Sequence, residues 1–253
     1  MSVETIAKTA SFAKSSCQRQ LLTVFCDFDG PLVDVSDRYY NTYHLALHET
    51  YYYYACFDPF LKINPLSKAE FWQMKQERAN DQEIALRSGL SVQHIPYFVQ
   101  QVHSIVNDAS LLTKDKFHHG VNWALALLHS QGVRLVVVTL RCQEQVTQIL
   151  TNYGLLRLFS GVYGTTDAMA AYNNNIECKT ALLKQALAEH QSDRTCMVGD
   201  TEADILAAKA MGTCAIALTC GIRSYNYLQQ FEPDQIRSNF LNTAYDLLAD
   251  ERL

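Results

Sequence analysis

The sequence predicts an α/β fold, with a doubly wound parallel sheet and an inserted, all-helical second domain. Short, continuous apolar runs alternate with segments whose apolar residues recur at helical spacing. This alternation is typical of parallel strands joined by right-handed helical crossovers. The rhythm is interrupted between residues 36 and about 115, where the segments look helical and no strand candidate is found.

Five apolar runs are the expected strands of the core. Each is apolar along its length because helices are expected to cover both faces of a parallel sheet. In chain order they are LLTVFC (21–26), VRLVVVTL (133–140), FSGVYG (159–164), TCMVG (195–199) and TCAIALT (213–219). Helices are expected over 121–132, 142–154, 179–190 and 202–212. The first two of these helices run up to Gly132 and Gly154, and glycine is the common residue at a helix C-terminus.

Residues 36–115 are predicted to form a helical domain planted on the carboxyl edge of the sheet. Helical segments are expected over 36–54, 67–78, 81–88 and 91–108, and SKAE (67–70) has the form of a capping box. An insertion of about eighty residues is far longer than an ordinary strand-to-helix loop. The core then comprises residues 21–35 and 116–253, preceded by a flexible or partly helical extension over 1–20.

The charge and hydropathy of the sequence argue against nucleic-acid and membrane partners. The formal net charge is −5 and no block of Lys and Arg occurs, so we expect no nucleic-acid binding. No apolar run approaches the roughly eighteen residues that span a bilayer, so we expect no membrane partner. The eight cysteines form no CxxC pair, which favours reduced thiols in a cytoplasmic protein. Either a monomer or a homodimer is expected, since the sequence does not distinguish them. An organelle-transit reading of the N-terminus is disfavoured by Glu4 and the scarcity of Arg.

Polar residues follow the carboxyl ends of several predicted strands, which is the edge where ligands bind in open parallel sheets. They are Asp27 and Asp29 after the first strand, Thr139 and Arg141 at the second, Lys179 at a helix start, and Asp200 and Asp204 after the fourth. Clustered carboxylates need a counter-charge, and Mg²⁺ is the simplest, with Asp27, Asp29 and Asp200 as ligands. Mg²⁺, Lys179 and Thr139 would then stabilise a phosphoryl group. One carboxylate is free to attack phosphorus, and a second to move the proton.

The motifs DFDGPLVD (27–34), VVVT (136–139), Lys179 and GDTEAD (199–204) occur in the order of the haloacid dehalogenase (HAD) superfamily, which the chain resembles from about residue 21 to 250. The resemblance implies a Rossmann-like core with a helical cap, Mg²⁺ as cofactor, and a role for each motif residue. Asp27 would be the nucleophile, Asp29 the acid/base, Thr139 and Lys179 the motif Thr and Lys, Asp200 the metal ligand and Asp204 its support.

Two features indicate which branch of the superfamily the chain resembles. By having Asp at position 29 the chain resembles the phosphatases and phosphomutases of the family. The dehalogenases lack this Asp, because a halide leaving group needs no proton. The C-terminal segment is similar to that of the phosphoglycolate phosphatase-like branch. Pro31 stands where the family motif usually has Thr, so any contact made by that hydroxyl is lost.

Several further residues are candidates to contact the substrate. From the helical domain they are Lys75, Arg78 and Arg87, and from the core Gly30, Leu140 and Arg141. A solvent-facing basic strip explains the first three as well. Lys184 is an alternative to Lys179 as the motif lysine. Asp34 is expected to hydrogen-bond within the turn after the motif. Asp204 is also expected near the positive end of a helix, where a carboxylate is stabilised without any metal.

The expected function is a Mg²⁺-dependent phosphatase for a small phosphate monoester, phosphoglycolate-like or a sugar phosphate, acting through an aspartyl phosphate. Two alternatives stay open. A phosphomutase differs only in the acceptor of the phosphoryl group, and a binding protein of the same fold would have lost turnover.

Overall fold

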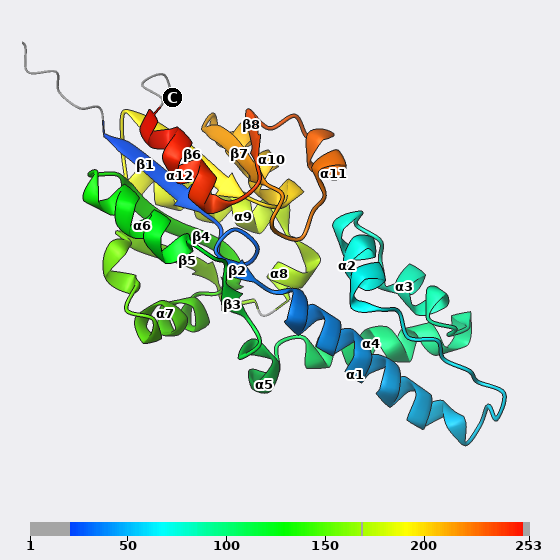
Figure 1. Ribbon diagram of the computed structural model, residues 1–253. Coiled ribbons are helices and arrows are strands. Elements are labelled where there is room, and N and C mark those ends of the chain that lie inside the picture. The colour runs from blue at the N-terminus through cyan, green and yellow to red at the C-terminus, as the bar shows by residue number, and fades with distance from the viewer. Residues whose placement is uncertain (1–20, 168, 250–253) are drawn as a thin grey trace, which may run out of the picture.

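A six-stranded parallel sheet forms the centre of the structure, a computed structural model that describes residues 21–167 and 169–249 (Figure 1). Its strands are β1 (Leu22–Cys26), β4 (Arg134–Cys142), β5 (Gly161–Thr165), β6 (Arg194–Gly199), β7 (Cys214–Leu218) and β8 (Gln235–Arg237), in the order β5-β4-β1-β6-β7-β8. The predicted parallel α/β core is therefore confirmed. The three residues of β8 were not predicted, because QIR is short and only half-buried.

Helices cover both faces of this sheet (Figure 1). One face packs against α6 (Val121–Ser130), α7 (Gln143–Asn152) and α12 (Phe240–Ala249), and the other against α9 (Ile176–Glu189) and α10 (Glu202–Met211). Adjacent residues of β1 divide between the two layers, since Val24 belongs to the first apolar cluster and Phe25 to the second. The continuous apolar runs in the sequence are explained by this two-sided burial.

The route of the chain creates a switch point beside β1. From β1 the chain passes to β4 and then outward to β5, before it returns to β6 on the other side of β1 and continues to β7 and β8. Cys26 is in register with Val137 of β4 and Val198 of β6, so the carboxyl ends of these three strands lie side by side. Ligands bind at such a point in doubly wound folds.

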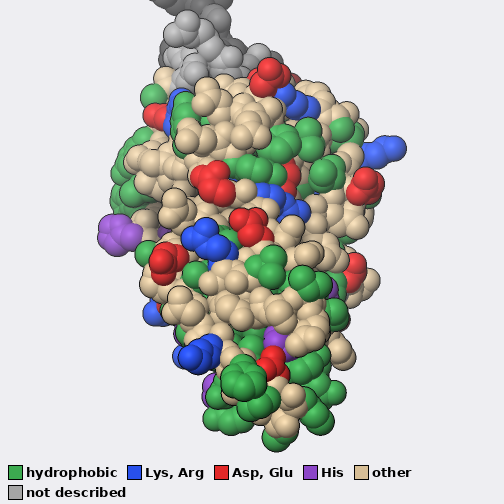
Figure 2. Space-filling view, turned by 90° about the vertical axis from the view of Figure 1, so that its right-hand side faces the viewer, with side chains coloured by type: hydrophobic (Ala, Val, Ile, Leu, Met, Phe, Trp, Pro, Cys, Tyr) green, Lys and Arg blue, Asp and Glu red, His purple; other side chains and the backbone are tan. Residues whose placement is uncertain are grey.

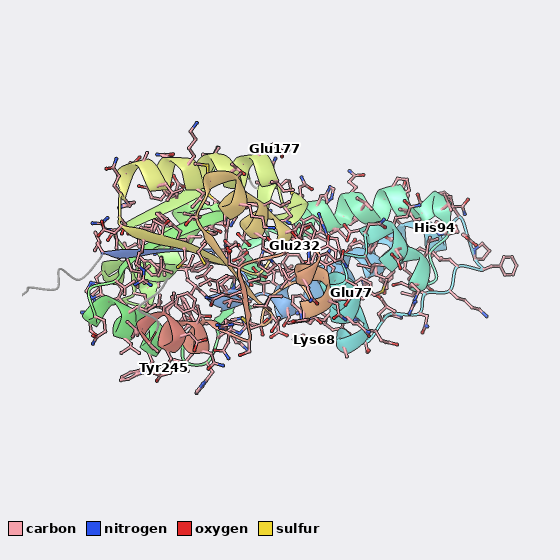
Figure 3. The ribbon with its side chains drawn as sticks, turned by 90° about the horizontal axis from the view of Figure 1, so that it is seen from above. Lys68, Glu77, His94, Glu177, Glu232 and Tyr245 are labelled. Atoms are coloured by element: carbon pink, nitrogen blue, oxygen red, sulfur yellow. The ribbon has the colours of Figure 1, made fainter. Side chains whose placement is uncertain are left out.

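The segment between β1 and β4 carries a group of helices that project from the sheet (Figure 1). They are α1 (Ser36–Ala55), α2 (Lys68–Gln76), α3 (Asp81–Arg87), η1 (Val92–His94), α4 (Ile95–Ile105) and α5 (Ala109–Leu112). The predicted capping box is present, since Ser67 accepts the N–H of Glu70 and the Glu70 side chain accepts the N–H of Ser67. Figure 3 shows His94 on this part, far from Tyr245 on the core.

A second, two-stranded sheet marks the place where the chain leaves and re-enters the core. Here β2 (Val33–Asp34) pairs antiparallel with β3 (Lys116–Phe117). Strands of two residues have no periodicity to detect, and the sequence did not predict them. The remaining elements are η2 (Leu156–Leu158), α8 (Ala170–Asn173) and α11 (Tyr225–Gln229).

The surface carries charges of both signs. On the face shown in Figure 2, acidic and basic side chains are interspersed across the middle of the molecule. None of the helices within the described residues is long and apolar enough to cross a membrane. The predicted extension over residues 1–20 lies outside the described residues.

Candidate active site

Three acidic side chains and one lysine meet at the carboxyl edge of the sheet, beside β1. Asp27 follows β1 directly and Asp200 follows β6, while Asp204 lies in the first turn of α10. The N–H of Asp27 donates to the carbonyl of Val198 at 2.9 Å, which continues the pairing of β1 with β6 by one residue. The sheet itself therefore places Asp27 next to Asp200.

Lys179 joins two of these carboxylates from the first turns of α9. Its side chain is fully buried, with Nζ 3.0 Å from Asp27 Oδ1 and 2.8 Å from Asp204 Oδ1. Nζ also donates to the carbonyl of Val138 on β4 at 3.0 Å. Although burial opposes the charged form, Asp204 and Asp27 raise the pKa of Lys179 above its ordinary value, so the ammonium is retained. The rival, Lys184, is exposed.

Asp27, Asp200 and Asp204 form a cluster whose ligand atoms lie within 4.8 Å of one another. Asp200 is fully buried, and its Oδ2 accepts the N–H of Ile222 at 2.6 Å. Within the described residues, Asp200 Oδ1 has no hydrogen-bond partner. Burial and the neighbouring charges of Asp204 and Asp27 raise the pKa of Asp200 well above its usual value. Among the described residues, Asp204 Oδ1 also lacks a hydrogen-bond partner and has only its ion-pair contact with Lys179. Hard oxygen donors that are buried and unsatisfied suit a divalent cation such as Mg²⁺.

Asp204 holds the backbone of this loop as well as facing the cluster. Its Oδ2 accepts the N–H groups of Asp200 at 3.2 Å and of Thr201 at 3.1 Å, and the Thr201 hydroxyl at 2.8 Å. Asp204 therefore caps the N-terminus of α10 through one oxygen, and its other oxygen faces Lys179. The helix-terminus role and the cluster role, which were alternatives in the sequence, are compatible.

The two oxygens of Asp27 differ in their surroundings. Oδ1 accepts the N–H of Phe28 at 2.7 Å and lies against Lys179, whereas Oδ2 has no hydrogen bond among the described residues. Burial raises the pKa of Asp27 to about 7, with Asp204 and Asp29 acting in the same direction and Lys179 opposing them. One oxygen of a rigidly held carboxylate is thus left open to the site.

Two glycines allow the surrounding loops to close on Asp200. A Cβ added to Gly30 or Gly221 would overlap Asp200 Oδ2. Gly30 also has a φ of +99°, in the region that favours glycine. The carbonyl of Gly30 accepts a hydrogen bond from His118 Nε2 at 2.8 Å, so the loop after β1 is held from the return side of the helical insertion. Gly30 therefore shapes the site through its backbone.

Asp29 points away from the carboxylate cluster and toward two arginines. Its Oδ2 accepts Arg38 Nη2 at 2.6 Å, and its Oδ1 accepts Arg141 Nη1 at 2.9 Å. Both arginines also contact Asp115. Although burial acts to raise it, the pKa of Asp29 is lowered because Arg141 and Arg38 stabilise the carboxylate. Of the four residues that the sequence predicted at the metal, Asp27, Asp200 and Asp204 form the cluster of potential ligands, and the side chain of Asp29 is not part of it.

Thr139 and Leu140 lie at the end of β4 in different roles. The buried Thr139 hydroxyl accepts the N–H of Arg141 at 3.2 Å. The side chain of Leu140 packs in an apolar cluster with Ala170 and Ala203. Leu140 is thus left with only its backbone to offer a substrate.

A small polar pocket of about 30 Å³ lies between the helical insertion and the core. Lys75 and Arg78 line it from one side and Arg223 from the other. The remaining lining residues include Tyr39, Tyr172, Asn174 and Thr201. Arg87, which was predicted to join Lys75 and Arg78, is exposed and is absent from this lining.

The charges in this pocket are partly compensated. Lys75 Nζ lies 4.9 Å from the centroid of the Tyr172 ring and 3.5 Å from Asp81 Oδ1, and burial lowers its pKa. Arg78 and Arg223 share the carboxylate of Glu202, each through an Nε–O distance of 2.9 Å. Three cations therefore face two carboxylates, which leaves an excess of positive charge for a ligand.

Sequence reasoning missed Arg38, Asp115 and Glu202. Arg38 and Asp115 stand at the two ends of the predicted insertion, and their opposite charges were the only signal that could have paired them. Glu202 lies inside the GDTEAD motif, where attention went to the aspartates. The expected role of Asp34 in the turn is confirmed, since its Oδ1 accepts the N–H of Ser36 at 2.8 Å.

Comparisons with known proteins agree with this geometry. A family model described as haloacid dehalogenase-like hydrolase matches residues 24–218. The chain is 26% identical over 233 residues to the pyrophosphatase PpaX of Halalkalibacterium halodurans, covering 90% of this chain and 96% of the relative. It is also 26% identical over 227 residues to a phosphoglycolate phosphatase of Synechococcus elongatus, covering 89% and 94%.

The fold has close counterparts among solved structures. A hydrolase of the haloacid dehalogenase-like family from Streptococcus pneumoniae superposes with a TM-score of 0.63 at 23% identity. The match covers 90% of this chain and 98% of that protein.

The contact of Gly221 with Asp200 gives a test of the cation site. In a Gly221→Ala protein the new Cβ should displace Asp200 and weaken Mg²⁺ binding about tenfold or more, as changes behind metal ligands do. Isothermal titration calorimetry with Mg²⁺ measures the affinity. Gly132→Ala is the control, because nothing lies within 4 Å of its added Cβ. Equal affinities for Gly221→Ala and wild type would contradict the assignment.

Proposed function

The chain belongs to the haloacid dehalogenase-like hydrolase family, and from this premise we propose that it is a Mg²⁺-dependent phosphatase of small phosphate monoesters. The observation that carries the proposal is the contact of the buried Lys179 with Asp27, beside the cluster of Asp27, Asp200 and Asp204. This arrangement brings the ammonium of Lys179 and a proposed cation site next to the proposed carboxylate nucleophile, Asp27, at the sheet edge. Phosphoryl transfer needs both positive charge and a nucleophile, because negative charge must be neutralised while phosphorus is attacked.

Asp27 is the proposed nucleophile. Its Oδ1 is fixed by Lys179 and the N–H of Phe28, so Oδ2 is the oxygen available to attack phosphorus. The new P–O bond forms as the bond to the leaving alcohol breaks, which gives an aspartyl phosphate. Water then attacks that phosphorus, releasing inorganic phosphate and restoring the carboxylate.

Asp200 and Asp204, with Asp27, are the proposed ligands of Mg²⁺. The unpartnered Asp200 Oδ1 and the raised pKa values in the cluster support this, since three buried carboxylates need a counter-charge. When bound, the cation supplies charge neutralisation for the phosphate oxygens. Lys179 contributes a second positive charge and offsets the repulsion between Asp27 and Asp204, which it bridges.

Asp29 is the proposed acid/base, and Thr139 the proposed donor to a phosphate oxygen. Asp29 would protonate the leaving oxygen in the first step and take a proton from water in the second. The Thr139 hydroxyl has only the N–H of Arg141 as a hydrogen-bond partner among the described residues, and that N–H leaves the hydroxyl hydrogen free to donate.

The helical insertion, residues 36–115, is proposed to act as a cap over the core of residues 21–35 and 116–253. The pocket between them carries Lys75, Arg78 and Arg223, with more positive than negative charge. A substrate with a second anionic group fits this better than a neutral one. The relatives are named for pyrophosphate and phosphoglycolate, whose phosphoryl groups are joined to such a group.

We place the enzyme in the cytoplasm. The seven cysteines within residues 21–167 and 169–249 are unpaired, as expected under reducing conditions.

The first test is a panel of phosphate monoesters assayed with Mg²⁺. Wild type should release inorganic phosphate from at least one, and Asp27→Asn should lose 10³-fold or more of that activity, on the order of a removed nucleophile. Full activity in Asp27→Asn would exclude the mechanism. A bisphosphate activator that produced isomerisation in place of phosphate release would identify a mutase instead.

The second test follows thermal unfolding with and without Mg²⁺. A cation at a hundred times its Kd should stabilise the fold by about 2.7 kcal/mol. Because the folded pKa of Asp27, about 7, is above its unfolded value, the cation-free fold loses stability as pH rises toward 7. Protons compete with the cation for Asp27, so the stabilisation by Mg²⁺ should shrink as pH falls below about 7.

The matched variant in this second test is Asp200→Asn. It should be more stable than wild type without Mg²⁺, since one of three repelling carboxylates is removed, and should gain no stability when Mg²⁺ is added. An undiminished response to Mg²⁺ in this variant would rule out Asp200 as a ligand.

The third test compares phosphoglycolate with ethyl phosphate, which lacks the carboxylate. Lys75→Met should lower kcat/KM for phosphoglycolate about tenfold, the order of one lost charged contact, and leave ethyl phosphate nearly unchanged. Lys68→Met is the control, because Lys68 is exposed and pairs with Asp37 on the surface. A uniform effect of Lys75→Met on both esters would argue against an anion contact.

A further inference from the structure

Asp29, Arg38, Asp115 and Arg141 form a closed ring of four charges, here called the acid–arginine ring. Arg38 joins Asp29 through Nη2 at 2.6 Å and Asp115 through Nε at 3.0 Å. Arg141 joins both carboxylates through one atom, Nη1, at 2.9 Å from Asp29 and 2.7 Å from Asp115. The four side chains are each less than a tenth exposed.

The ring engages both oxygens of both carboxylates, and its charges sum to zero. Buried ion pairs of this kind are tolerated only when every charge has a partner, which explains why two acids accompany two arginines. The consequence for Asp29 is a constraint on its chemistry. Each oxygen of Asp29 is engaged by an arginine, whereas a general acid must turn one oxygen toward the leaving group.

Asp115 supplies a way to relieve that constraint. Arg141 Nη1 is shared between the two acids and already lies closer to Asp115 than to Asp29. If Asp29 turns toward the leaving group, Arg141 and Arg38 keep Asp115 as an acceptor, so neither guanidinium is left buried without a partner. Without Asp115, Asp29 is the only carboxylate in contact with either arginine, and its release becomes costly.

The ring also joins the acid/base to the helical insertion. Arg38 lies in the first turn of α1, where the chain leaves the core, and Asp115 immediately precedes β3, where it returns. The ring therefore connects both crossings to Asp29 and to Arg141 at the end of β4. A displacement of the insertion relative to the sheet changes the distances within the ring.

We propose that Asp115 is a positioning residue, which acts through Arg38 and Arg141 to let Asp29 leave its ion pairs and protonate the leaving alcohol. The inference rests on the proposed phosphatase function. In the step concerned, the P–O bond to the alcohol breaks, a P–O bond to Asp27 forms, and one proton passes from Asp29 to the departing oxygen. A poor leaving group requires that proton and a good one, such as p-nitrophenolate, does not.

The experiment measures kcat/KM for ethyl phosphate and for p-nitrophenyl phosphate in wild type and Asp115→Asn. This ratio reports the steps up to departure of the alcohol, so the later hydrolysis of the aspartyl phosphate does not enter. Asp115→Asn should lower kcat/KM for ethyl phosphate about tenfold or more, a part of the 10²–10⁴ that general acids contribute, and change p-nitrophenyl phosphate less than about threefold. In an Asp29→Asn background, Asp115→Asn should cause no further loss with ethyl phosphate.

Control variants separate this role from structural support. Asp37→Asn removes a half-exposed carboxylate next to Arg38 and should leave both substrates unaffected. Asp115→Glu keeps the charge but displaces the carboxylate, and should restore part of the ethyl phosphate activity. If circular dichroism shows that Asp115→Asn does not fold, Asp115→Glu is compared with wild type instead. It should lose kcat/KM for ethyl phosphate, by less than Asp115→Asn would, and keep that for p-nitrophenyl phosphate.

An equal loss with both substrates, or a further loss in the Asp29→Asn background, would overturn the proposal. Neither result would affect the proposed function, because wild type would still hydrolyse both esters. Wild type inactive on the whole monoester panel would instead refute the proposed function itself.

Discussion

The site depends above all on the buried ammonium of Lys179 between Asp27 and Asp204. Its three contacts reach β4 through the carbonyl of Val138, the end of β1 through Asp27, and the start of α10 through Asp204. A lysine without exposed surface keeps its charge only when carboxylates surround it, and those carboxylates tolerate burial only with the lysine present. Removing Lys179 would leave Asp27 and Asp204 as buried carboxylates without a counter-charge.

This mutual dependence explains how the acidic edge is built. The sheet brings the carboxyl ends of β1, β4 and β6 together, so Asp27 and Asp200 become neighbours through backbone pairing alone. Gly30 and Gly221 then let two loops approach Asp200 more closely than any side chain would allow. The result is two more carboxylates than Lys179 can balance, and that imbalance is the physical reason for expecting a divalent cation.

A second charge system lies beside the first and has a different character. The ring of Asp29, Arg38, Asp115 and Arg141 has equal numbers of positive and negative charges and engages all four carboxylate oxygens, whereas the cluster at Asp200 has an excess of negative charge and an unpartnered carboxylate oxygen. The two systems divide the carboxylates of the DFDGP segment between them, Asp27 to the cluster and Asp29 to the ring. Two acids that are two residues apart therefore sit in opposite environments: burial raises the pKa of Asp27 to about 7, and arginines lower the pKa of Asp29. Without a cation these shifts oppose the proposed roles, because a nucleophile must be ionised and a general acid must be protonated. A cation at the cluster would favour the ionised form of Asp27, and release from the arginines would let Asp29 take up a proton.

The sequence by itself determined the parallel core, the helical insertion and the set of acids at the sheet edge. Strands buried on both faces must be apolar throughout, so their ends and the polar residues after them are visible in the chain. Only the tertiary structure decided the partners of those acids. Arg38 and Asp115 are 77 residues apart, and Arg223 meets Arg78 at Glu202 across the junction of core and insertion. Pairing at such separations depends on how the insertion packs against the core, and no local periodicity in the sequence indicates it. For the same reason Asp29, grouped by sequence with the metal ligands, belongs in three dimensions to the arginines.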